Sequence, residues 1–148
     1  MKTRQTILIT GASSGLGRGM AIEYAKMGRD LALCARRIDR LEALQAELLQ
    51  IDPNIRISIK TLDVNRHQQV FEVFDAFNKE FAGIDRIIIN AGMGKGASIG
   101  SGHFEANKQT AETNFIALIA QAEAAMTIFR AQNNGHLVTI SSVSAVRG

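Results

Sequence analysis

The sequence predicts an α/β protein built on a doubly wound parallel sheet with the strand order 3-2-1-4-5. Short apolar runs alternate with amphipathic segments along the 148 residues, which is the pattern of parallel strands covered by helices on both faces. A glycine-rich turn joins the first apolar run to the first helical segment. Right-handed crossovers from that turn then lead to the stated strand order.

Five short apolar runs are the expected strands. Each is continuous, or nearly so, in apolar residues, which is typical of strands buried on both faces of a parallel sheet. They cover residues 6–10, 31–34, 55–59, 86–90 and 136–140.

Four helical segments lie between these strands. The first three carry apolar residues at three- or four-residue spacing, which is typical of a helix. These residues are Leu16, Met20 and Tyr24, then Leu41, Leu44 and Leu48, then Val70, Phe74, Phe77 and Phe81. Gly28 and Pro53 follow the first two helices, as residues that end a helix commonly do. The fourth segment, residues 104–130, is apolar on more than one face, so we expect further protein or a partner subunit to cover it.

Length and composition indicate one domain, residues 1–148, with a substantial core. No apolar run approaches the roughly 18 residues that span a bilayer, and the start of the chain has no signal-peptide core, so we expect a cytoplasmic protein without membrane contacts. The net charge is only +3 and its basic residues are scattered, which argues against nucleic-acid binding. The single cysteine, Cys34, excludes an internal disulfide and is interpreted as a small core residue.

The glycine-rich turn, residues 10–17, has the chemistry of a dinucleotide phosphate site. Gly11 allows a sharp turn, Gly15 lets the backbone approach a pyrophosphate, and Gly17 lets the helix pack closely on the strand. The helix N-terminus then offers free N–H groups to the phosphates. The predicted cofactor-binding residues here are Gly11, Ser13, Ser14, Gly15, Leu16 and Gly17. Taken alone, the glycines also fit an ordinary strand-to-helix loop.

The glycine spacing identifies a resemblance. The usual Rossmann fingerprint is Gly-x-Gly-x-x-Gly, whereas this turn reads Gly-x-x-x-Gly-x-Gly. That variant resembles the short-chain dehydrogenase/reductase family, whose members bind NAD or NADP through a Rossmann-type sheet. The resemblance extends over essentially the whole sequence, with six motif positions in the family's order.

Two arginines follow the second strand, where the adenosine ribose of a dinucleotide is expected. An acidic residue here would favour NAD, but the chain has Arg36 and Arg37. Guanidinium groups pair with phosphate through charge and a planar fork of donors, so we expect NADP(H) to be preferred over NAD(H). The alternative is a pair of solvated surface arginines. Ser14 stands where many NADP-dependent family members carry a basic residue.

The resemblance assigns Asp63 and Val64, after the third strand, to the adenine ring. In the family, the aspartate accepts a hydrogen bond from the adenine amino group. The alternative for Asp63 is an N-cap of the third helix.

Ile89-Asn90-Ala91-Gly92 ends the fourth strand and resembles the family's Asn-Asn-Ala-Gly motif. The resemblance implies that Asn90, Ala91 and Gly92 line the cofactor. Ile89 replaces the first asparagine of that motif, which removes one structural hydrogen bond.

Two residues are expected to take part in catalysis. Asn114 lies within the fourth helical segment, where asparagine is a poor choice because its side chain competes with the backbone. The resemblance implies that it orders a water in a proton relay, while the alternative is a tolerated helical asparagine. Ser142 ends the fifth strand and, by resemblance, donates a hydrogen bond to the substrate oxygen; Ser141 and Ser144 are less favoured alternatives.

The family's Tyr-x-x-x-Lys motif does not occur in the sequence, whose only tyrosine is Tyr24 in the first helix. We therefore expect residues 1–148 to be the N-terminal part of an NADP(H)-dependent oxidoreductase, without the catalytic helix and the C-terminal strands of the family. Such an enzyme transfers a hydride between nicotinamide and a carbonyl or alcohol substrate, and this part alone is expected to be inactive. A non-catalytic NADP-binding protein is one alternative. A methyltransferase is another, and the glycine spacing and Arg36 argue against it.

The remaining expectations concern partners and metals. By resemblance, residues 104–130 contribute to a homodimer or homotetramer. His67, His103 and His136 show no metal-ligand spacing, so no metal site is expected. Lys95 is interpreted as a solvated lysine in a loop near the substrate side.

Overall fold

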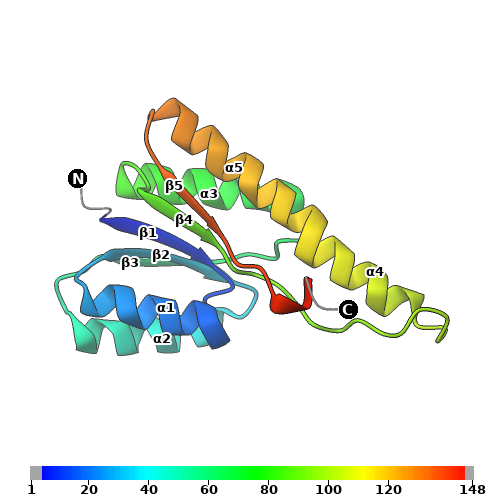
Figure 1. The fold of residues 1–148 in the computed structure, drawn as a ribbon. Coiled ribbons are helices and arrows are strands. Elements are labelled where there is room, and N and C mark those ends of the chain that lie inside the picture. Colours follow the sequence, from blue (N-terminus) through cyan, green and yellow to red (C-terminus); the bar gives the residue numbers. More distant parts are fainter. Residues whose placement is uncertain (1–4, 146–148) are drawn as a thin grey trace.

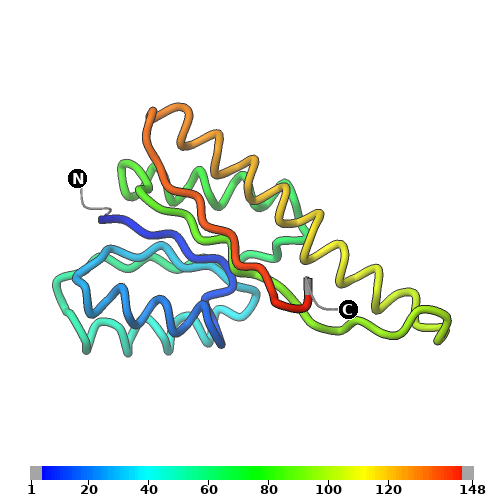
Figure 2. Tube along the Cα trace, in the orientation of Figure 1, coloured from blue at the N-terminus to red at the C-terminus, as the bar shows by residue number. Residues whose placement is uncertain are grey.

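The computed structural model describes residues 5–145 and contains a five-stranded parallel sheet with the order β3-β2-β1-β4-β5 (Figure 1). The strands are β1 (Thr6–Thr10), β2 (Asp30–Ala35), β3 (Ile57–Thr61), β4 (Arg86–Ile89) and β5 (His136–Thr139). The predicted fold class and strand order are confirmed. The tube in Figure 2 shows the chain moving outward from β1 to β3 and then returning past β1 to form β4 and β5.

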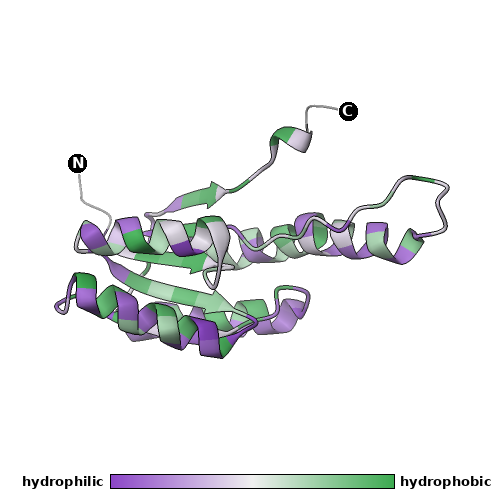
Figure 3. Cartoon of the chain, turned by 90° about the horizontal axis from the view of Figure 1, so that it is seen from below, coloured by the Kyte–Doolittle hydropathy of each residue, from purple (hydrophilic) through white to green (hydrophobic). Residues whose placement is uncertain are grey.

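Helices cover both faces of the sheet. On one face lie α1 (Gly15–Lys26) and α2 (Ile38–Ile51), and on the other lie α3 (His67–Phe81) and α5 (Ala117–Ala131) (Figure 1). In Figure 3 the strands are largely coloured as hydrophobic, while the helices show mixed colouring. This distribution agrees with a buried sheet between two layers of amphipathic helices.

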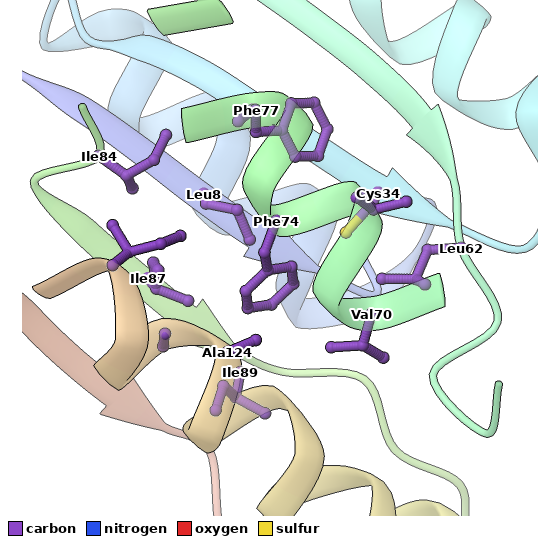
Figure 4. Packing of buried hydrophobic residues seen from close by; sticks show 14 of the residues in the cluster. Leu8, Cys34, Leu62, Val70, Phe74, Phe77, Ile84, Ile87, Ile89 and Ala124 are labelled. Carbon is purple, nitrogen blue, oxygen red and sulfur yellow. The ribbon is translucent and has the colours of Figure 1, made fainter. Parts of the chain in front are cut away.

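The alternation of side chains along β1 divides the core between the two faces. Ile7 and Ile9 belong to the hydrophobic cluster with α1 and α2, whereas Leu8 belongs to the cluster with α3 and α5. Figure 4 shows Phe74 of α3 among Leu8, Ile87 and other residues of this second cluster. Cys34 lies in the same cluster and is 1% exposed, which confirms its interpretation as a core residue.

The third strand lies two residues later than predicted. Ile55 is buried but belongs to the bend before β3, which begins at Ile57 opposite Leu31 of β2. The Asp52 carboxylate accepts a hydrogen bond from the Asn54 N–H (2.9 Å) and holds the preceding turn. The apolar run includes both the bend and the strand, so periodicity alone could not separate them.

The fourth predicted helix is divided by a wider turn. The structure contains α4 (Phe104–Ala111), a π-helical turn η1 (Glu112–Ile116) and then α5, in place of one regular helix over 104–130. Apolar side chains on this segment are exposed, since Phe115 is 62% exposed and no residue of α4 is buried; that further protein or a partner subunit covers them stays a prediction. Within residues 5–145, no helix combines the length and apolar character needed to cross a membrane.

Candidate functional site

A cavity of about 660 Å³ opens at the carboxyl ends of the strands, where the strand order reverses between β1 and β4. Ligands of open α/β sheets bind at such a switch point. The walls come from the loops after β1 to β4 and from α4 and η1. The lining residues are Thr10, Gly11, Ser13, Ser14, Leu16, Cys34, Ala35, Arg36, Arg37, Leu62, Asp63, Val64, Asn65, Asn90, Ala91, Gly92, Met93, Lys95, Gln109, Glu112 and Thr113.

The glycine-rich turn has the close packing that its sequence predicts. Gly11 (φ 65°) and Gly15 (φ 54°) adopt left-handed backbone conformations that favour glycine. A Cβ on Gly17 would overlap the carbonyl oxygen of Gly11 and lie 2.6 Å from the Asn90 amide nitrogen. Gly15 and Gly17 therefore shape the turn without lining the cavity itself.

The start of α1 faces this turn with its backbone donors free of a side-chain cap. Ser14 occupies the N-cap position in an extended conformation, and its hydroxyl makes no capping hydrogen bond. The first N–H groups of a helix have no intrahelical acceptors and carry a partial positive charge. This arrangement suits an anionic group held beside Ser13 and Ser14.

Asn90 and Thr10 join β1 to β4 at the cavity wall. The Asn90 side-chain amide donates to the carbonyl oxygens of Thr10 (3.2 Å) and Gly11 (3.3 Å). The Thr10 hydroxyl accepts hydrogen bonds from the backbone N–H groups of Asn90 (3.1 Å) and Ala91 (3.2 Å). Asn90 thus fixes the turn after β1 as well as the end of β4.

Three basic and two acidic side chains line the cavity. Arg36 and Arg37 are exposed, and neither forms an ion pair with any residue in the range 5–145. Lys95, which the sequence placed in a loop near the substrate side, also lines the cavity and is exposed. Asp63 and Glu112 supply the acidic groups.

Asp63 does not cap α3. That helix begins at His67 with Arg66 at the N-cap position, so the N-cap alternative is wrong. The Asp63 carboxylate instead accepts the backbone N–H of Asn65 (3.0 Å) in a local turn that precedes the helix. This turn leaves Asp63 half-buried at the cavity wall.

Asn114 lies in η1 and holds the loop after β4. Its side-chain oxygen accepts the Met93 N–H (2.8 Å), and its side-chain nitrogen donates to the Met93 carbonyl (2.7 Å). Asn114 does not line the cavity, although Met93 does. The poor helix propensity of asparagine therefore coincides with a π-helical turn and with a side chain that has two backbone partners.

Ser142 follows β5 and is exposed. Its hydroxyl accepts the Ser144 N–H at 3.1 Å, and it lies outside the cavity lining. No group of three or more His, Cys, Asp or Glu side chains within residues 5–145 could hold a metal ion.

Several lining residues were missed by the sequence analysis. The polar ones are Thr10, Asn65, Gln109, Glu112 and Thr113. Thr10, which follows the apolar run Ile7–Ile9 at the end of the first strand, is the one local signal among them. The others reach the cavity through tertiary contacts that no short-range pattern encodes.

The family model for short chain dehydrogenases matches residues 5–148. The chain belongs to the short-chain dehydrogenase family. Members of this family are oxidoreductases that use NAD or NADP, and membership excludes the methyltransferase alternative.

Known relatives of this short-chain dehydrogenase chain are longer than the region they share with it. An uncharacterized oxidoreductase of Mycobacterium tuberculosis is 58% identical over 146 residues, which are 99% of this chain and 58% of the relative. The NADP-dependent 3-hydroxy acid dehydrogenase of Schizosaccharomyces pombe is 33% identical, with 95% of this chain and 54% of the relative covered. The crystal structure of levodione reductase superposes with a TM-score of 0.92 at 29% identity, covering 100% of this chain and 58% of that one.

Proposed function

We propose that residues 1–148 form the cofactor-binding domain of an NADP(H)-dependent oxidoreductase that acts on a carbonyl or alcohol substrate. The observation that carries this proposal is the cavity at the switch point, whose rim presents Arg36 and Arg37 without ion-pair partners among residues 5–145. The bound cofactor supplies or accepts the hydride. Residues 1–148 contain no Tyr-x-x-x-Lys motif, so this domain would bind the cofactor and contribute Ser142 and Asn114 to the reaction.

The glycine-rich turn and the start of α1 would hold the pyrophosphate. The close approach of Gly17 to Gly11 leaves no room for side chains between the turn and the helix, and Ser13, Ser14 and Leu16 line the cavity beside it. Backbone N–H groups at a helix N-terminus bind phosphate oxygens without a charged side chain. Ser14 would add a hydroxyl donor.

Arg36 and Arg37 would select the phosphorylated cofactor. Both follow β2, at the position expected to contact the adenosine ribose. An arginine fork binds a phosphate through paired, charge-assisted hydrogen bonds. The NADP dependence in the name of the Schizosaccharomyces pombe relative supports this preference.

The remaining walls would enclose the adenine and nicotinamide ends. We assign Asp63 and Val64 to the adenine, because the carboxylate of Asp63 is held at the wall beside that loop. Asn90, Ala91 and Gly92 would line the nicotinamide side, where Asn90 fixes the ends of β1 and β4.

Ser142 and Asn114 would serve the reaction itself. We assign the Ser142 hydroxyl to the substrate oxygen, where a donor stabilises the charge that develops during hydride transfer. Asn114 would order a water for proton relay while its side chain holds the loop at Met93. We also assign the exposed apolar side chains of η1 and α5, including Phe115 and Ile119, to a homodimer or homotetramer contact.

The substitution Arg36→Asp tests the cofactor preference in the full-length protein. Loss of a charge-assisted hydrogen bond and gain of repulsion should raise the Kd for NADPH about 10-fold or more, with little change for NADH. Arg40→Asp makes the same charge change on α2, at an exposed residue that does not line the cavity, and should leave both Kd values near wild type. Equal losses for the two cofactors in Arg36→Asp would refute the phosphate role.

A further inference from the structure

A hydrogen-bonded pair joins two walls of the cavity that are distant in sequence. The Asn65 side-chain nitrogen donates to the Thr113 hydroxyl at 2.9 Å, and the hydroxyl lies 3.3 Å from the Asn65 side-chain oxygen. Asn65 belongs to the loop between β3 and α3, whereas Thr113 belongs to η1. Both residues line the cavity, so the pair forms part of its wall.

The same asparagine also orients the carboxylate of Asp63. The Asn65 backbone N–H donates to the Asp63 carboxylate at 3.0 Å, and the Arg66 N–H donates to the Asp63 carbonyl at 2.9 Å. The Asp63 N–H donates to the side-chain oxygen of Gln69 at 3.2 Å. The loop therefore holds Asp63 by local contacts, and Thr113 supplies a contact from another layer of the fold.

Thr113 is well placed to act as a fixed anchor. Its side chain is buried, in contrast to the exposed residues on either side of it in η1. The neighbouring Asn114 is bound to both backbone polar groups of Met93. Two successive residues of the π-helical turn thus fasten two loops, one after β3 and one after β4.

We infer that Thr113 is a positioning residue that, through Asn65, holds Asp63 where its carboxylate can accept a hydrogen bond from the amino group of the cofactor's adenine. This inference rests on the proposed function, because it requires a dinucleotide in the cavity. The Thr113 hydroxyl makes the hydrogen bond to Asn65, and a valine would fill the same buried volume without making it. Removal of the hydroxyl leaves the Asn65 amide without this partner and frees the loop that carries Asp63.

The test compares Thr113→Val with Thr113→Ser in the full-length protein, because valine keeps the shape and serine keeps the hydroxyl. The Kd is measured for NADPH and for its hypoxanthine analogue, in which an oxygen replaces the adenine amino group. Thr113→Val should weaken NADPH binding about 3- to 10-fold, the loss expected for one hydrogen bond. Binding of the hypoxanthine analogue should change by less than about 2-fold, and Thr113→Ser should bind both as wild type does.

A second variant removes the Asn65–Thr113 hydrogen bond by changing Asn65, the exposed partner. Asn65→Ala removes the side chain but keeps the backbone N–H that Asp63 accepts, and its exposed position makes loss of folding a poor explanation for any effect. It should reproduce the selective loss of NADPH affinity.

The outcomes separate this inference from the proposed function. If wild-type protein binds no NADPH, the proposed function fails and the inference fails with it. If wild-type protein binds NADPH but Thr113→Val and Asn65→Ala bind it equally well, only the inference is overturned. Equal losses of affinity for NADPH and for the hypoxanthine analogue would also overturn the inference. Thr113 would then affect the whole fold and not the adenine end of the site.

Discussion

Gly17 lies where the fold leaves no room for a methyl group. It lies in α1 against the turn after β1, and a Cβ there would overlap the Gly11 carbonyl oxygen. The same atom would lie 2.9 Å from the Gly11 carbonyl carbon and 2.6 Å from the Asn90 amide nitrogen. Two of these three neighbours are backbone atoms, so the clash cannot be relieved by moving a flexible side chain.

The cost of Gly17→Ala follows from these distances. Real Cβ atoms essentially never approach a heavy atom closer than 3.0 Å, so α1 must shift away from the turn or the turn must deform. Overpacking of this kind costs about 1–3 kcal/mol, and the helix gains about 0.5–1 kcal/mol when alanine replaces glycine. The net loss should lie between about 0 and 2.5 kcal/mol, which corresponds to a fall in Tm of up to roughly 10 °C for a protein of this size. Relative to a glycine-to-alanine change in the same helix that meets no clash, the loss should be about 1–3 kcal/mol.

Gly19→Ala is the matched control, because it lies in the same helix and a Cβ there meets no heavy atom within 4 Å. The free energy of unfolding should rise by about 0.4–1 kcal/mol, as expected when alanine restricts the unfolded chain. Thermal unfolding followed by circular dichroism at 222 nm measures both variants. If Gly17→Ala proves as stable as Gly19→Ala, the close packing of α1 on the turn is refuted.

Three further predictions concern other parts of the site and fold. Ser142→Ala should lower kcat about 10-fold or more in the full-length enzyme with little change in NADPH affinity, and unchanged turnover would contradict its role. Cys34 is buried, and burial raises the pKa of its thiol, so a thiol reagent should label it only as fast as the protein opens; complete labelling within seconds would contradict this. Burial alone raises the pKa of Glu80, but hydrogen bonds from Ser58 and Lys60 outweigh it and lower the pKa. Glu80→Gln should therefore destabilise the protein by less than about 1 kcal/mol at pH 7, and chemical denaturation should show the difference vanishing as the pH falls from 4.5 through the lower folded-state pKa.

The sequence allowed most of the fold to be predicted because its strands are buried on both faces. β1 matches its predicted range, Thr6–Thr10, since a continuous apolar run ends there at a glycine turn. β3 was displaced because the buried Ile55 extends the apolar run into a bend. The π-helical turn could not be anticipated, because poor helix formers such as Thr113 and Asn114 also occur in regular helices and do not specify a wider turn.

The candidate site was predictable where backbone shape determines it. Gly11 and Gly17 carry a local signal, because close approach and a left-handed conformation require glycine. The Asn65–Thr113 pair carries none, since it joins residues 48 positions apart through a threonine in a helix and an asparagine in a loop. Such pairs depend on how the layers meet, which the composition of neither segment specifies.

The Kd values of wild-type protein for NADPH and NADH, measured by titration calorimetry at one salt concentration, test the central claim most directly. The arginines at the cavity rim predict that NADPH binds about 10-fold or more tightly than NADH. Equal affinities, a preference for NADH or binding of neither cofactor would contradict the proposed function.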